Sequence, residues 1–397
     1  MFSEHFKTFS RIYGDGIVLP SNRMASYDTF FRPSLTSAKN RYNVEVPYVN
    51  PAGRRMRLEL GFILNDRERN AVCSREGEAM CCGLYSCLPF HFFEIAACCM
   101  SYTDFLPFLG PARPIRKVRE LLPDTVLFGF APEHFQDLYR HEQFIGSLEN
   151  QNPFRASLTC WLMHLMLELY WYHEVGHALL GHPDYLAEKR GLNAVSEDNR
   201  DDGPPTVQRE RILLEKQADA FASVEFFSLD SIEGSMRTGT AFGLSRYQVC
   251  AIRMICVVLV CYSWIWTEFR RTTIARFSRV KAGLHPPAVV RYELWLRSMH
   301  QRTKKGKPID GVLRDLGMPR ELLGEPKPQE PEDTFVKAFE ILEQNLDALV
   351  HLDASFEGIE HFRNSLQKRI ATHQNEVGHD KLLRAILEKY QYKQIDV

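Results

Sequence analysis

The chain has 397 residues, of which 45% are hydrophobic and 25% are charged, and its formal net charge at pH 7 is −1. This length and composition predict a globular protein with ample core, in one large domain or two to three smaller ones. The balanced charge lacks the excess of Lys and Arg that binds nucleic acid or an anionic membrane, so we expect neither as a partner.

Residues 1–150 are predicted to form an N-terminal α+β region that is part of the catalytic domain. The first residues carry charges where a secretory signal needs an apolar core, so we expect a cytoplasmic protein. Residues 57–65 begin with alternating polar and apolar side chains, which predicts an edge strand that could pair with an extended substrate. Residues 77–102 predict a helix broken at Pro89. A short strand and a helix are expected further along, at residues 126–130 and 132–148.

The ten cysteines are spaced irregularly, unlike a disulfide framework. In a cytoplasmic protein they are predicted to be reduced, buried thiols. A cysteine-rich metal site is the alternative, but the chain contains no Cys-x-x-Cys pair. The cysteines that such a site would draw on are Cys73, Cys81, Cys82, Cys87, Cys98 and Cys99.

The most informative stretch is an apolar segment that ends in His173-Glu174-Val-Gly-His177. Asn152-Pro153 predicts the start of a helix, and Gly181 with the proline at 183 predicts its end. Residues four apart share a helix face, so His173 and His177 can direct two imidazoles at one metal ion. Glu174, about 100° round the helix, can then reach a water molecule on that metal. A core helix with ordinary hydrogen-bonded histidines is the alternative.

A second predicted helix carries Glu215 and Asp219, which also share one face. A catalytic zinc needs a third protein ligand, and a ligating histidine needs an acceptor for its other ring nitrogen. The longer Glu215 suits the metal, and the shorter Asp219 suits a bond to the imidazole of His173. Glu225 lies nearly three turns beyond Glu215, too far to join the same site.

A different zinc class, in which a third histidine follows the first motif, would require glycine at position 180 and histidine at position 183. The chain has Leu180 and Pro183 instead, so that arrangement is excluded. His182 is about 140° from the face of His177 on a continuous helix. We expect it at the helix end or behind a ligating histidine rather than on the metal.

A third motif, His285-Pro-Pro-Ala-Val-Val-Arg291, follows the two helices. The three motifs, in this order and spacing, resemble those of the gluzincin metallopeptidases, and the third is similar to a signature of HtpX-like and CaaX-prenyl peptidases. The sequence around His173 is also similar to the phage-exclusion, Lit-type peptidases. The resemblance covers about residues 152–297. It implies a zincin-like core, a Zn²⁺ cofactor, and positions near the cleft for His285 and Arg291. For Arg291 the alternative is an ion pair with Asp219 or another buried carboxylate.

The remaining segments complete the predicted organisation. Residues 183–210, between the two metal-binding helices, are strongly polar and predict a surface insertion. Residues 249–267 are apolar, but Arg253 interrupts them and the charge-free part has only 14 residues, whereas a membrane span needs about 20. We therefore expect a buried helix there and no membrane. The predicted divisions are the N-terminal region, a catalytic helical core, a linker and a C-terminal helical region: 1–150, 151–300, 301–333 and 334–397.

Together these patterns predict an α+β, mostly helical protein with a zincin-like metallopeptidase core, a small edge sheet and a C-terminal helical appendage. The favoured function is hydrolysis of peptide bonds, with Zn²⁺ held by His173, His177 and Glu215 and with Glu174 as the base. By resemblance, His285 and Arg291 would donate hydrogen bonds to the reacting group or the substrate backbone.

A self-sufficient protease inside a cell must be restrained. We therefore expect a restricted protein or peptide substrate, an occluded cleft or an activating partner, and a role in phage exclusion or another regulated defence or stress response would be one such case. The alternative function is a zinc-stabilised interaction or scaffold protein with vestigial or no proteolysis. The intact Glu174 argues against it, because a scaffold needs no base beside its metal.

Overall fold

The computed structural model describes most of the N-terminal and central chain, and within it the protein is mostly helical with one five-stranded mixed sheet, which confirms the predicted α+β class. The described residues are 2–19, 25–49, 53–65, 70–100, 105–110, 153–191, 194–196 and 205–275, with 334, 337, 338, 340–342 and 345. The helices are α1 (Glu4–Ile12), α2 (Ala25–Phe30), α3 (Arg32–Arg41), α4 (Leu88–Met100), η1 (Pro107–Leu109), α8 (Pro153–Leu179), α9 (His182–Arg190), α10 (Pro205–Phe226), α11 (Leu229–Ala241) and α12 (Arg246–Ala275). The strands are β1 (Tyr48–Val49), β2 (Arg55–Ile63), β3 (Ala71–Glu76), β4 (Ala79–Tyr85) and β5 (Ala194–Ser196).

The strands lie in the order β1-β2-β4-β3-β5, with β2 and β4 parallel and the other neighbours antiparallel. A two-residue turn at Gly77-Glu78 joins β3 to β4, and Gly77 has a φ of +59°, which favours glycine. Residues 57–63 form a strand as predicted, and over this stretch the described pairing is with β4 on one side and a single bridge from Ile17 to Ile63 on the other. Strand β1 pairs with β2 at Arg55 and Met56, so the outer strands are β1 and β5. An alternating pattern indicates a strand but not its neighbours.

Helix α1 covers one face of the sheet and α8 lies on the other. Gly61 and Gly83 are partners in β2 and β4, and a Cβ atom at Gly61 would lie 2.6 Å from the ring of Phe6 in α1. The helix can approach the sheet this closely because glycine has no side chain. On the opposite face Phe62 packs edge-on against Trp171 of α8, with ring centroids 5.2 Å apart. The sheet therefore supports the central helix directly.

The segment 77–102 differs from its prediction. Its first half forms β4, which is buried along its whole length, and only its second half forms the helix α4. Pro89 lies in the first turn of α4, where a missing N–H costs nothing, rather than at a break within a longer helix. A short apolar run that is buried on both faces has no period that separates strand from helix, so the pattern predicted the wrong element.

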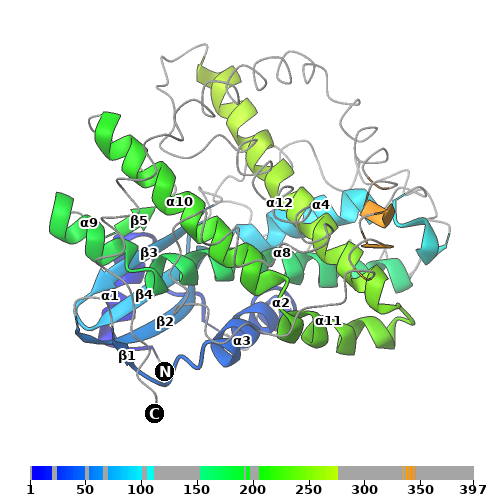
Figure 1. The fold of residues 1–397 in the computed structure, drawn as a ribbon, viewed down its shortest axis with the longest axis horizontal. Coiled ribbons are helices and arrows are strands. Elements are labelled where there is room, and N and C mark those ends of the chain that lie inside the picture. Colours follow the sequence, from blue (N-terminus) through cyan, green and yellow to red (C-terminus); the bar gives the residue numbers. More distant parts are fainter. Residues whose placement is uncertain are drawn as a thin grey trace.

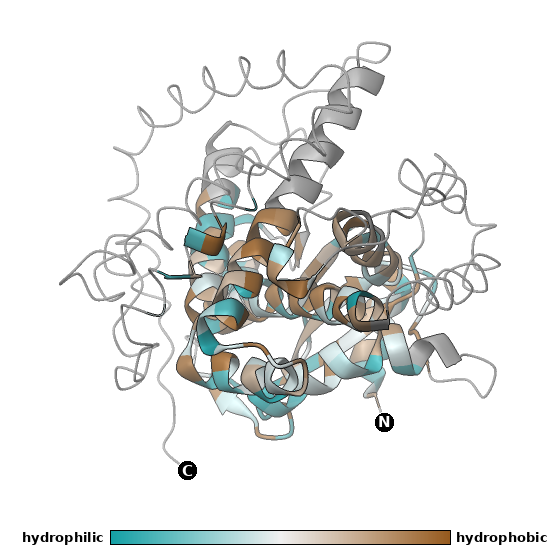
Figure 2. Ribbon diagram, turned by 90° about the vertical axis from the view of Figure 1, so that its right-hand side faces the viewer, coloured by the Kyte–Doolittle hydropathy of each residue, from teal (hydrophilic) through white to brown (hydrophobic). Residues whose placement is uncertain are grey.

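Helix α8 runs through the middle of the described fold, with α4, α10 and α12 packed along it (Figure 1). Figure 2 shows hydrophobic stretches on several of the described helices, and the described side chains of α12 from Val249 to Val260 are all buried. In the described part of the chain, no single helix is long and apolar enough to cross a membrane. Helix α11 and the first part of α12 reach the required length and hydropathy only together, across a bend of 112°.

Residues 183–210 are a surface insertion only in part. They contribute α9 and the edge strand β5, which pairs with β3. Tyr185, Leu186 and Val195 are buried and form a small cluster with Leu214. The polar residues in the middle of the segment dominate its average composition, which hides the apolar positions on either side.

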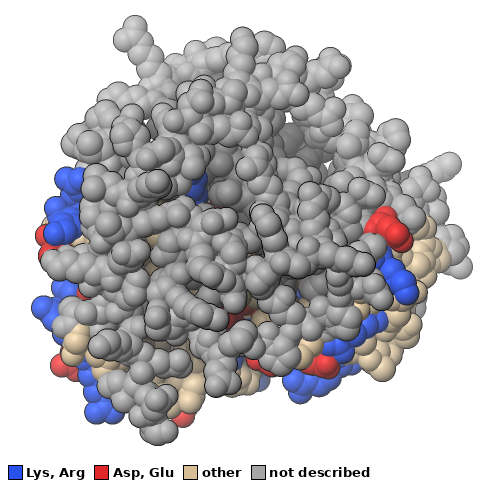
Figure 3. Space-filling view, in the orientation of Figure 1, with Lys and Arg blue, Asp and Glu red and all other residues tan. Residues whose placement is uncertain are grey.

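Some C-terminal residues pack into the main core. Ala338 and Leu342 are fully buried there, and the side-chain oxygen of Asn345 accepts a hydrogen bond from the backbone N–H of Leu106 at 2.6 Å. The predicted linker 301–333, like the strand and helix predicted within 126–148, lies outside the described residues. On the face drawn in Figure 3, the described atoms show basic and acidic side chains interspersed, as the balanced net charge leads one to expect.

Candidate metal centre

The candidate site begins with α8, whose observed bounds confirm the helix predicted from its end signals. The side chains of His173, Glu174 and His177 are almost fully buried, with 3%, 1% and 1% of their surface exposed. One turn of helix separates the two imidazoles, whose ring centroids lie 4.7 Å apart. Burial of two histidines and a carboxylate in one turn requires polar partners from elsewhere in the fold.

The main partner is Glu215 of α10. One of its carboxylate oxygens, Oε2, lies 3.1 Å from Nε2 of His173, and the other, Oε1, lies 3.4 Å from Nε2 of His177. The two Nε2 atoms are 3.0 Å apart. Two imidazole nitrogens and one carboxylate thus converge on a single point, and one ligand atom from each residue lies within 4.8 Å of the others.

This donor set fits zinc. In a tetrahedral site with bonds of about 2.0–2.1 Å, neighbouring ligand atoms lie about 3.3 Å apart. The two imidazole nitrogens here are 3.0 Å apart, and each has one carboxylate oxygen of Glu215 nearby, at 3.1 Å for His173 and 3.4 Å for His177. Neutral imidazole and carboxylate are ligands that zinc prefers, and a cation would balance the buried charge of Glu215. The protein therefore contains a buried His-His-Glu group that can hold a metal ion.

Asp219 lies one turn beyond Glu215 on α10 and contacts the other side of His173. Its Oδ1 atom is 3.0 Å from Nδ1 of that imidazole, and the carboxylate is buried. A carboxylate can only accept, so Nδ1 of His173 donates to Asp219, and Nε2 is the ring atom that faces Glu215 and would bind a metal ion. This is the position in which the sequence placed Asp219.

Close packing of α8 on α10 brings these groups together. A Cβ atom at Gly176, inside the His-Glu-x-x-His motif, would lie 3.0 Å from Cδ1 of Phe221 and 3.3 Å from Cα of Ala218. Glycine at 176 and alanine at 218 therefore let the two backbones approach more closely than larger side chains would allow. Gly176, one of the two unspecified positions of the motif, therefore determines how closely α10 brings its carboxylates to the histidines.

Glu174 lies on the side of α8 that faces the sheet. Its backbone carbonyl accepts a hydrogen bond from the thiol of Cys82 at 3.4 Å, and Cys82 lies opposite Cys73, with the two sulfur atoms 3.7 Å apart. Burial raises the pKa of both thiols, and the nearby Glu174 raises it further. These cysteines are free, as predicted, and stay protonated near neutral pH.

Behind His177 the structure places His182 and Gln217. Nδ1 of His177 lies 2.8 Å from Nδ1 of His182, and Nε2 of His182 lies 3.1 Å from Oε1 of Gln217. Burial lowers the pKa of His182 well below its usual range, and the neighbouring His177 lowers it further. The sequence placed His182 behind a ligand or at a helix end, but the sequence analysis missed Gln217. A polar residue between Glu215 and Asp219 in a buried segment was the available signal, because such a group needs a partner.

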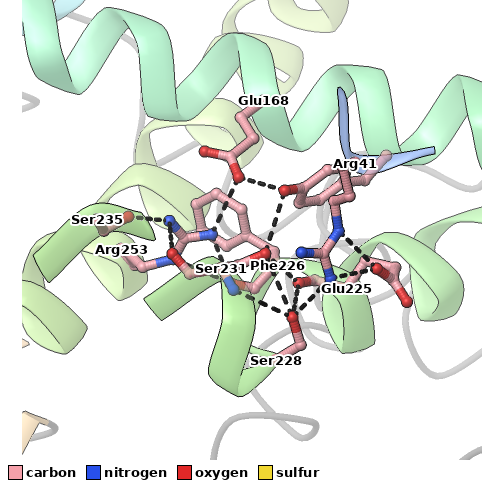
Figure 4. A network of polar contacts seen from close by, with 9 residues as sticks. Arg41, Glu168, Glu225, Phe226, Ser228, Ser231, Ser235 and Arg253 are labelled. Atoms are coloured by element: carbon pink, nitrogen blue, oxygen red, sulfur yellow. Dashed lines mark hydrogen bonds and ion pairs between the residues drawn. The ribbon is translucent and has the colours of Figure 1, made fainter. Parts of the chain in front are cut away.

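Glu225 belongs to a different network, in agreement with its exclusion from the metal site. Figure 4 shows it bound to Arg41, whose Nη2 lies 2.5 Å from the carboxylate. In the same view the fully buried Arg253 donates to the carbonyl of Phe226 at 2.5 and 2.9 Å and lies 3.7 Å from Glu168. The charge that interrupts the apolar run of α12 is thus neutralised and hydrogen-bonded inside the core.

His285 and Arg291, which the resemblance placed near the cleft, lie outside the described residues. Comparison with protein-family models, curated proteins and solved structures finds no match to the chain. The likeness to the gluzincins therefore remains an interpretation of the motifs. The structure adds the geometry of the His-His-Glu group to that interpretation.

Proposed function

We propose that the protein is a zinc-dependent endopeptidase. The observation that carries this proposal is the convergence of His173 and His177 of α8 with Glu215 of α10. Helix α8 also carries Glu174, between the two histidines. Metal ligands alone would serve a structural site equally well. A buried carboxylate next to a histidine ligand is the group that hydrolysis requires in addition.

The chemistry divides among the residues by their positions. When bound, zinc would supply Lewis acidity that lowers the pKa of a water molecule to about 7 and polarises the scissile carbonyl. Glu174 would take the proton from that water and later deliver it to the leaving amine. Asp219 would hold His173 in orientation through Nδ1. His285 and Arg291 keep their proposed role as donors to the substrate or the developing oxyanion.

We also propose that the substrate is a restricted protein or peptide of the cytoplasm. The three metal-binding side chains are 1–3% exposed, and this burial supports restricted access for a peptide. Such burial is one way to restrain an intracellular protease, and an activating partner would be another. A role in phage exclusion or another defence or stress response is consistent with this restraint.

The test combines metal content with cleavage. Purified protein should contain about one zinc per chain. Incubation with a lysate of its own host should produce a single new fragment that a zinc chelator abolishes. Glu174→Gln should retain zinc and lose the cleavage, while Glu233→Gln, an exposed residue paired with Arg246, should change neither. If Glu174→Gln cleaves as well as the wild type, the proposed mechanism is wrong.

Two other outcomes discriminate between alternatives. If the wild type binds zinc but wild type and Glu174→Gln are equally inert on all substrates, the protein is a zinc-stabilised scaffold. Indiscriminate digestion of casein would contradict the proposed restraint while leaving the chemistry intact.

A further inference from the structure

A chain of hydrogen bonds leads away from the metal centre on the side of His177 opposite to Glu215. His177 contacts His182 through Nδ1, and His182 contacts Gln217 through Nε2. His182 is fully buried and Gln217 nearly so. The proposed hydrolysis assigns no task to either residue, although a buried imidazole and a buried amide both need partners.

A metal ion on His177 would determine the position of every proton in this chain. A metal ion bound to Nε2 of His177 would leave the proton of that imidazole on Nδ1, from which it donates to Nδ1 of His182. A neutral imidazole has one donor and one acceptor, so His182 would then donate from Nε2. The amide oxygen of Gln217, 3.1 Å away, is the acceptor for that proton.

We infer that His182 and Gln217 are positioning residues that hold His177 in the tautomer able to bind the metal. The inference rests on the proposed metal site and deepens it. His173 obtains the same tautomer directly from Asp219, whereas His177 obtains it from a neutral amide through a second imidazole. Helix α10 would therefore supply the third ligand and both orienting acceptors from residues 215, 217 and 219.

The local fold holds His182 in the place that this role requires. Gly181, with a φ of +71°, ends the path of α8 and turns the chain into α9, so that His182 lies beside the imidazole of His177 rather than one turn along the same helix. Two residues later Asp184 binds Arg75 of β3 at 2.6 Å, which fixes the start of α9 against the sheet. The contact joins the Nδ1 atoms of the two rings, whereas Nε2 of His177 is the atom near Glu215, so the contact orients His177 and leaves His182 outside the ligand set.

The test uses two substitutions at Gln217 that differ in one property. Gln217→Met has a similar length but no acceptor, while Gln217→Glu keeps an acceptor. Zinc affinity, measured by competition with a chromophoric chelator, should fall about 10–100-fold in Gln217→Met, the usual effect of removing a residue that orients a ligand. Gln217→Glu should remain close to the wild type. Equal loss of affinity in both variants, or wild-type affinity in Gln217→Met, would overturn the inference.

A second measurement on the wild type does not depend on how the variants fold. Side-chain ¹⁵N shifts of histidine in the zinc-bound protein report which ring nitrogen carries the proton. His182 should carry it on Nε2, and a proton on Nδ1 of His182 would refute the relay. Because this readout does not need cleavage, the relay can fail while hydrolysis stands. It can equally hold in a protein that proves to be a scaffold.

Discussion

The sharpest difference expected at the metal centre is between two carboxylates one turn apart on α10. The oxygens of Glu215 face Nε2 of both histidines, at 3.1 and 3.4 Å, whereas Asp219 lies 3.0 Å from Nδ1 of His173, on the other side of that ring. Removal of Glu215 therefore deletes one of three protein ligands. Removal of Asp219 leaves all three and loosens the orientation of one imidazole.

We expect Glu215→Ala to be purified without stoichiometric zinc. Asp219→Ala should still bind zinc, with an affinity lower by about 10–100-fold, which corresponds to about 1.4–2.7 kcal/mol. Elemental analysis of the purified variants gives the stoichiometry, and chelator competition gives the affinity. Both variants should be compared in the same buffer, because metal affinity depends on pH.

Glu225→Gln is the matched control. It lies on the same helix and is held by Arg41 rather than by the histidines, so it should keep full zinc binding and lose only stability. The assignment would be refuted if Glu215→Ala retained stoichiometric zinc, or if Asp219→Ala lost zinc completely while Glu215→Ala kept it. Either result would also remove the basis for the gluzincin-like ligand set.

Two further predictions concern stability. Arg253→Met should lower the free energy of unfolding, measured in urea, by about 3–5 kcal/mol. The reason is that it leaves the carbonyl of Phe226 and the carboxylate of Glu168 without their buried cation. A loss below about 1 kcal/mol would contradict this prediction. Burial lowers the pKa of His164 to about 4, so between about pH 6.5 and 4 the unfolded chain binds a proton that the folded protein does not. Lowering the pH from about 6.5 to 4 should therefore reduce the free energy of unfolding of the wild type, by at most about 3 kcal/mol more than in His164→Phe. Equal pH dependence in both proteins would refute this prediction.

Local pattern was sufficient for the two helices that form the candidate site. The end signals of α8, the four-residue spacing of His173 and His177, and the same spacing of Glu215 and Asp219 are each properties of about one helical turn. Such features depend on residues that are close in sequence and survive any change in the surrounding fold. For that reason the bounds of α8 and the shared faces of the ligands agree between sequence and structure.

The sequence alone also determined the class of the fold, the composition of the ligand set as a hypothesis, and the expectation that α12 is a buried helix. It did not determine partners across the fold. Strand β4 required the neighbours β2 and β3 to be recognised as a strand, because a short apolar run has no diagnostic period. In the sequence, Arg253 only interrupts an apolar run. The structure shows that carbonyl groups at the end of α10 and in α11 accept its hydrogen bonds.

Only the tertiary structure decided that His182 and Gln217 lie behind His177. Gln217 and His182 are 35 residues apart in sequence, and neither carries a spacing that refers to the other. They meet because Gly176 lets α8 and α10 approach closely, while Gly181 turns the chain into α9. Hydrogen bonds form between atoms about 3 Å apart whatever their separation along the chain. A sequence therefore states which groups need partners, and the packing of the helices states which partners they receive.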